Sequence, residues 1–139
     1  MFIQFVTPLN LPCYRSWDFE VCAGVFELDL QAVRNCLSSA RPNNPKWLPE
    51  LEKIRMDCTD GDLFEMKPEL ADALGKVAYS LISTGKFRSA RCPKCNKIYE
   101  PEEIVMKEWS FGSGLSGEGG HRFECPLQHT LYAETLWQS

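Results

Sequence analysis

Two short clusters of metal-binding residue types in the last third of the chain constrain its fold more than any other feature. Cys92 and Cys95 are separated by two residues, and Cys125 and His129 are separated by three. Three thiolates and one imidazole complete a tetrahedral shell, which structural Zn²⁺ prefers. Proline follows the first cysteine of each cluster and restricts the backbone of the turn. We therefore expect one structural zinc ion per chain, bound by Cys92, Cys95, Cys125 and His129.

His121 is the alternative for the fourth ligand. It precedes Cys125 by four positions, a spacing that suits chelation from a helix. Residues 121–124 are instead typical of a strand, in which four residues span about 13 Å, too far for two ligands of one ion. His129 is therefore the preferred ligand, and we expect His121 near the end of a hairpin.

The seven cysteines indicate reduced thiols rather than a disulfide framework. An odd number cannot pair completely within one chain, and the N-terminal residues lack the pattern of a secretory signal. No apolar run approaches the roughly 18 to 20 residues that span a bilayer. We therefore expect a cytoplasmic protein. The cysteines outside the two clusters are isolated in the sequence and are expected to be buried and unreactive: Cys13, Cys22, Cys36 and Cys58.

Charge is distributed unevenly along the chain. Residues 1–85 carry 8 Lys and Arg against 12 Asp and Glu, whereas residues 86–139 carry 7 of each. Neither part is as basic as a typical nucleic-acid-binding domain. Residues 86–97, however, hold five cations and no acid, so they either follow a phosphate backbone or offset the negative charge of a Cys3His zinc centre. The candidate nucleic-acid contacts are Lys86, Arg88, Arg91, Lys94 and Lys97.

Residue patterns in the N-terminal part predict both strands and helices. Apolar residues 2–6 indicate a strand, and residues 17–21 and 26–30 alternate between apolar and polar, as half-buried strands do. Asp29 occupies the N-cap position of a short helix whose apolar positions are Leu30, Val33 and Leu37. Residues 41–45, with two prolines and two asparagines, indicate a break in ordered structure.

Two further elements follow this break. Asp60-Gly61 is a turn dipeptide, and it predicts a hairpin with strands at 54–56 and 63–66. Pro68 begins the clearest helix of the sequence, and Gly85 follows its end. Its apolar residues recur at three- and four-residue steps on one face that we expect to be buried: Leu70, Ala71, Leu74, Val77, Ala78, Leu81 and Ile82.

The segment between and after the two clusters predicts β-structure. Strands are expected at 104–111 and 121–124, with a glycine-rich hairpin tip at 112–120 and a final strand at 130–137. The G-x-G-x-x-G pattern in this tip lies between strands, whereas a dinucleotide-binding loop precedes a helix. With their hairpin and final strand, the two ligand clusters resemble a zinc ribbon over residues 90–137. The resemblance implies metal-binding architecture only, because ribbons serve transcription, translation, ubiquitin-related and purely structural roles.

These observations predict an α+β protein of two units. Residues 1–85 would form a small mixed domain with a clear amphipathic helix, and residues 86–139 a β-hairpin zinc ribbon. A zinc ion with four protein ligands has no open position for water, which argues against an enzyme. Without His129 the site would resemble a catalytic zinc, but the His-x-Glu of zinc deaminases is missing. A protein–protein adaptor is the leading hypothesis. The alternative is a nucleic-acid-binding or transcription- or translation-associated regulator that uses residues 86–97.

Overall fold

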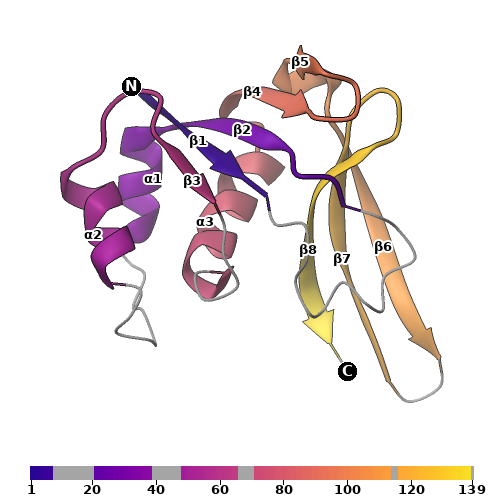
Figure 1. Cartoon of the computed structure of the whole chain (residues 1–139). Helices are drawn as coiled ribbons and strands as arrows, with labels where there is room; N and C mark the ends of the chain where they lie inside the picture. The colour runs from indigo at the N-terminus through magenta and orange to yellow at the C-terminus, as the bar shows by residue number, and fades with distance from the viewer. Residues whose placement is uncertain (8–20, 39–47, 66–70, 114–115, 139) are drawn as a thin grey trace.

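Two β-sheets and three α-helices make up the part of the chain that the structure describes (Figure 1). The structure is a computed structural model, and it describes residues 1–7, 21–38, 48–65, 71–113 and 116–138. The predicted strand at 17–20, the break at 41–45 and the helix start at Pro68 lie outside these residues.

The first sheet has five strands in the order β3-β1-β2-β4-β5. Strand β1 pairs with β2 in antiparallel and with β3 in parallel orientation, while β4 is antiparallel to both β2 and β5. Alternate residues of β1 and β2 are buried on one face, as period-two patterning requires. The strands are β1 Phe2–Val6, β2 Val25–Asp29, β3 Leu63–Glu65, β4 Phe87–Cys92 and β5 Lys97–Tyr99.

The second sheet has three long antiparallel strands in the order β6-β7-β8. A short 3-10 helix, η4 (Pro101–Glu103), connects the first sheet to it. The strands are β6 Val105–Ser113, β7 Ser116–Glu124 and β8 Thr130–Gln138.

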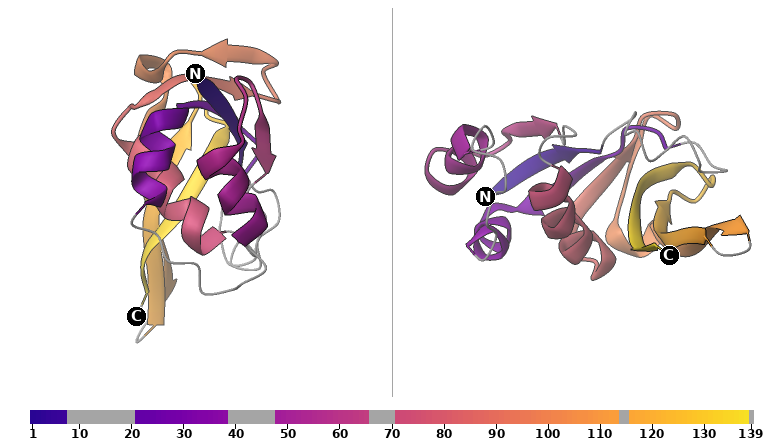
Figure 2. Two further views of the ribbon diagram at one scale, coloured as in Figure 1. Left: turned by 90° about the vertical axis from the view of Figure 1, so that its left-hand side faces the viewer. Right: turned by 90° about the horizontal axis from the view of Figure 1, so that it is seen from below.

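The helices lie on one face of the five-stranded sheet (Figure 2). They are α1 Leu30–Leu37, α2 Leu48–Met56 and α3 Ala71–Ser83. Asp29 caps α1 by accepting a 2.9 Å hydrogen bond from the backbone N–H of Ala32, as expected. No described helix has the length and apolar character to cross a membrane.

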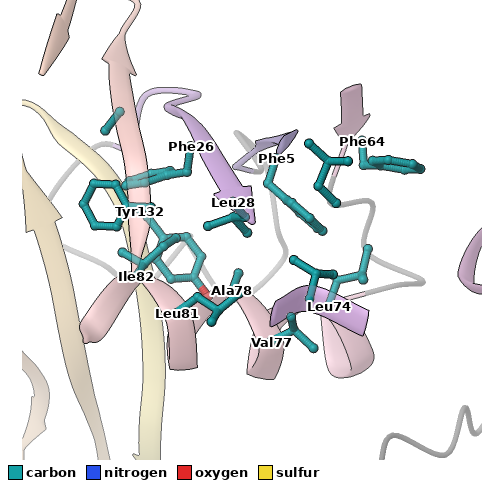
Figure 3. Packing of buried hydrophobic residues seen from close by; sticks show 14 of the residues in the cluster. Phe5, Phe26, Leu28, Phe64, Leu74, Val77, Ala78, Leu81, Ile82 and Tyr132 are labelled. Atoms are coloured by element: carbon teal, nitrogen blue, oxygen red, sulfur yellow. The ribbon is translucent and has the colours of Figure 1, made fainter. Parts of the chain in front are cut away.

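A single buried cluster joins the two sheets through α3 (Figure 3). The ring centroid of Tyr132 on β8 lies 6.4 Å from that of Phe26 on β2. Its hydroxyl donates a 3.2 Å hydrogen bond to the carbonyl oxygen of Gly75 on α3. The core therefore contains residues from both sides of the expected boundary after residue 85. The division into two domains stays a prediction.

The prediction of an α+β protein with a hairpin ribbon is wrong. Of the described residues, 46% are in strands and 28% in helices, so the protein is mostly β. The hairpin and the final strand predicted for the ribbon are both present, but they pair as β6, β7 and β8 in one three-stranded sheet. Strands β4 and β5, which carry the first ligand cluster, belong to the N-terminal sheet instead.

The hairpin predicted around Asp60-Gly61 is also wrong. Residues 48–56 form α2, so no strand forms at 54–56, and β3 pairs with β1 instead. The turn itself is present, because Gly61 has a φ of 85° and Asp60 accepts a 2.8 Å hydrogen bond from the N–H of Phe2. The prediction of a turn at Asp60-Gly61 is therefore confirmed, but the strand that pairs with β3 is β1, at the start of the chain.

Several other elements are confirmed. Strands were expected at 2–6, 26–30, 104–111 and 130–137, and the structure has β1, β2, β6 and β8 there. The helix expected before Gly85 is α3, and its apolar positions are buried: Leu74, Val77, Ala78, Leu81 and Ile82. The short helix after Asp29 is α1, with Leu30, Val33 and Leu37 buried.

Truncation of Leu74 tests the central role of α3. Leu74 is 1% exposed, so Leu74→Ala should lower the free energy of unfolding by about 2–5 kcal/mol through lost burial and a residual cavity. Lys76→Ala, at an exposed position of the same helix, should change it by less than about 0.5 kcal/mol. Equal effects of the two variants in urea denaturation would contradict burial of this face.

Candidate metal centre

Two pairs of residues that are distant from each other in the sequence meet where the two sheets approach each other. Cys92 and Cys95 lie at the end of β4 and in the turn before β5, while Cys125 and His129 lie in the connection between β7 and β8. One donor atom from each lies within 4.8 Å of all the others. Cys92 and Cys125 are buried, and Cys95 and His129 are half-buried.

The spacing of these donor atoms fits one tetrahedral ion. Zn–S bonds of 2.3 Å and Zn–N bonds of 2.0–2.1 Å place tetrahedral ligands about 3.8 Å (S to S) and about 3.6 Å (S to N) apart. The sulfurs of Cys95 and Cys125 are 3.7 Å apart. The Nδ1 atom of His129 lies 3.5, 3.2 and 3.4 Å from the sulfurs of Cys92, Cys95 and Cys125. The cluster can therefore hold a metal ion, with Nδ1 as the imidazole donor.

The two ligand turns have the same internal hydrogen bonding. In the first, the N–H of Cys95 donates to the sulfur of Cys92 at 3.4 Å. In the second, the N–H of His129 donates to the sulfur of Cys125, also at 3.4 Å. Backbone donors aimed at sulfur stabilise the thiolate that a metal ligand must be.

Each turn also contains a residue with positive φ. Asn96 has a φ of 55° and Gln128 a φ of 69°, values that residues other than glycine rarely adopt. The N–H of Asn96 donates to the carbonyl oxygen of Cys92 at 2.8 Å, and that of Gln128 to the carbonyl oxygen of Cys125 at 2.8 Å. This backbone feature was not predicted, because neither position holds the glycine that signals it.

The cysteines of the cluster differ in acidity. A hydrogen bond from the hydroxyl of Tyr99 lowers the pKa of Cys95 to about 7, and the same contact raises the pKa of Tyr99 to about 12. Burial raises the pKa of the Cys92 and Cys125 thiols. Metal binding must therefore displace protons from these two buried thiols.

Cys22 is a fifth thiol beside the cluster. It is 5% exposed, donates a 3.3 Å hydrogen bond to the carbonyl oxygen of Thr130 and also hydrogen-bonds the side chain of Cys92. Burial raises the pKa of Cys22. Of the isolated cysteines expected to be buried, Cys22 and Cys58 are buried, Cys36 is half-buried, and Cys13 lies outside the described residues. No sequence signal links Cys22 to a ligand 70 positions later.

His121 lies outside the cluster. It occupies the interior of β7 rather than the expected hairpin end. Its Nδ1 atom lies 2.9 Å from the hydroxyl oxygen of Tyr79, and the two rings stack with centroids 6.0 Å apart. The structure thus brings His129 rather than His121 to the three cysteines.

The candidate nucleic-acid contacts are exposed but not equivalent. Arg88 forms a 2.6 Å ion pair with Glu27, and its guanidinium lies 4.1 Å from the ring centroid of Phe2. This arginine is therefore partly neutralised by the sheet that carries it. The other four candidates are exposed just before β4, on β4, in the β4–β5 turn and at the start of β5, and a role in nucleic-acid contact stays a prediction for them: Lys86, Arg91, Lys94 and Lys97.

Comparison with known proteins finds no matching family, no matching curated protein and no matching solved structure. The resemblance to zinc ribbons stays an interpretation of the ligand pattern. The metal-binding assignment rests on the geometry of the Cys3His cluster in this chain.

Separate substitution of the two histidines by alanine tests which of them is the fourth metal ligand. His129→Ala should reduce bound metal from one ion per chain to well below half an ion after dialysis against a weak chelator, because it removes one of four donors. His121→Ala should retain the ion, because His121 contacts Tyr79 instead. Elemental analysis of both purified variants measures this, and the opposite pattern would assign the fourth position to His121.

Proposed function

We propose that this protein is a non-enzymatic binding module that carries one structural Zn²⁺ and acts as an adaptor by contacting another protein. The observation that carries the proposal is the closed donor set of Cys92, Cys95, Cys125 and His129. Four protein ligands fill a tetrahedral shell, so no position is left for water or substrate. The ion would then serve structure rather than catalysis.

The chemistry of the donors favours zinc over other divalent ions. Thiolates are soft ligands, and tetrahedral sites with sulfur and nitrogen donors are typical of zinc. In this chain the ion would connect the β4–β5 turn of the first sheet to the β7–β8 connection of the second. A cross-link between two sheets stabilises their relative position, because it restricts the unfolded chain and holds two turns together.

Exposed apolar side chains beside the ligands support a protein partner. Ile98 follows the first ligand pair and is 70% exposed, and Leu127 lies between the second pair and is 64% exposed. Protein contact sites bury exposed apolar side chains, so these two residues are the candidate contacts of a partner. The net charge of −4 and the Glu27–Arg88 ion pair favour this hypothesis over binding to nucleic acid.

Removal of the metal ligands tests the structural role of zinc. The purified chain should contain one zinc per molecule, and Cys92→Ser with Cys95→Ser should contain none and unfold at a lower temperature. Cys36→Ser, which removes a half-buried thiol outside the cluster, should keep its zinc. Hydrogen exchange after chelation should show loss of protection first in residues 86–138. Full zinc retention in the double variant would contradict the proposed site.

Substitution of the two exposed apolar residues by serine tests the adaptor role. Proteins retained from native extract by the zinc-loaded chain should be lost with the double variant Ile98→Ser and Leu127→Ser, which leaves all four ligands in place. Mass spectrometry of the retained material measures this. Leu63→Ser, at an exposed position on β3, is the matched control and should retain the same proteins.

A salt titration separates the alternative function from the proposed one. An adaptor should not be retained on random DNA or RNA at about 0.15 M salt. Retention that falls steeply with salt and is lost with Arg91→Gln and Lys97→Gln would instead support nucleic-acid binding through residues 86–97.

A further inference from the structure

The three-stranded sheet contains a cleft at a distance from the metal ligands. Its volume is about 480 Å³, within the range of small-ligand sites. His121 lines it and precedes Cys125 by four strand positions, which corresponds to about 13 Å. The lining residues come from all three strands: Glu108, Trp109, Ser110, Gly120, His121, Leu136 and Trp137.

Trp137 provides an aromatic wall whose position depends on a glycine. A Cβ atom at Gly119 would lie 2.5 Å from Cε2 and 2.8 Å from Nε1 of the indole, so the ring packs directly against the glycine backbone. The side chain nevertheless remains 51% exposed. One side of the indole is covered by the sheet, and its remaining surface is available to a ligand.

Among the residues that line the cleft, Glu108 supplies the negative charge. Glu108 is exposed and pairs across the strands with His121, whose other neighbour across the sheet is Glu134. The nearest cations along the strands, Lys107 and Arg122, instead contact Glu124 at 2.7 and 3.7 Å. Within the described residues, no ion pair neutralises Glu108.

His121 is held in place at the bottom of this arrangement. Its Nδ1 atom contacts the hydroxyl of Tyr79 on α3, and its ring stacks on that tyrosine. A fixed imidazole, a hydroxyl from Ser110 and a carboxylate from Glu108 offer hydrogen-bonding groups along the cleft, next to the exposed indole.

We infer that this cleft binds a guanidinium group, namely an arginine side chain of a protein partner. A guanidinium is planar, stacks on an indole face and forms two parallel hydrogen bonds with a carboxylate, so Trp137 and Glu108 match its two recognition surfaces. The net charge of −4 attracts such a cation over longer distances. The cleft is larger than one side chain and accommodates the neighbouring residues of a peptide. That the arginine belongs to a protein partner rests on the proposed adaptor function.

Titration of the zinc-loaded full chain with small probes tests the inference without a partner. Acetyl-Ala-Arg-Ala-amide should shift amide resonances of residues 108–110, 119–121 and 136–137. It should bind about tenfold more tightly than the matched citrulline peptide, which has the same shape but no charge. Glu108→Gln and Trp137→Ala should each weaken binding about fivefold, while Glu102→Gln, an exposed carboxylate on η4, should not.

The outcomes separate this inference from the adaptor function. Equal binding of the arginine and citrulline peptides, or no effect of Glu108→Gln, would overturn the guanidinium site. If free arginine amide bound as tightly as the peptide, the inference that the guanidinium belongs to a protein partner would be contradicted. These titrations require no captured partner, so a failed extract experiment leaves their result intact. Zinc content and circular dichroism of each variant establish that it is folded.

Discussion

The meeting of two ligand turns from different sheets is the constraint on which the rest of the structure depends. Cys92 ends β4 and Cys95 follows it, and Cys125 and His129 lie between β7 and β8, yet their donor atoms lie within 4.8 Å of one another. To bring them together, the second sheet must turn back toward the first, with α3 packed against both. The Tyr132 contacts with Phe26 and Gly75 are the apolar and polar sides of the same arrangement. Metal ligation and core packing therefore require the same relative position of the two sheets.

Much of the local structure was predictable, whereas the pairing of distant segments was not. Asp29 and the apolar spacing after it predicted α1 because capping and amphipathic periodicity are local properties. The ligand spacing likewise identified four residues that the structure brings together. By contrast, the parallel pairing of β3 with β1 joins segments almost sixty residues apart, so the turn at Gly61 was assigned the wrong partner. The contact of Cys22 with Cys92 and the positive φ of Gln128 also have no signature in residue type.

The two proposed contact surfaces differ in what keeps them in position. Leu127 lies within the second ligand turn, and Ile98 lies on β5 directly after the first, so the position of Leu127 relative to Ile98 depends on the metal that would connect the two turns. Trp137 and Glu108 are placed by strand pairing and by the close approach of the indole to Gly119, so their arrangement depends on backbone hydrogen bonds. A partner that contacted both surfaces would bind fully only when the metal is bound and the three-stranded sheet is intact. Such a partner would distinguish the complete fold from either incomplete form.

The packing of Tyr132 against Phe26 has a consequence for synthesis of the chain on the ribosome. Roughly a hundred residues separate the two rings, and translation at about 5–20 residues per second delays the second by roughly 5 to 20 seconds. During that interval β2 and the apolar face of α3 lack the strand that covers them. In such a nascent chain β2 is already paired with β1 and β4, but the Phe26 ring lacks its contact with Tyr132. Its yield in a cell would then depend on chaperones that shield the first sheet until the last strand emerges.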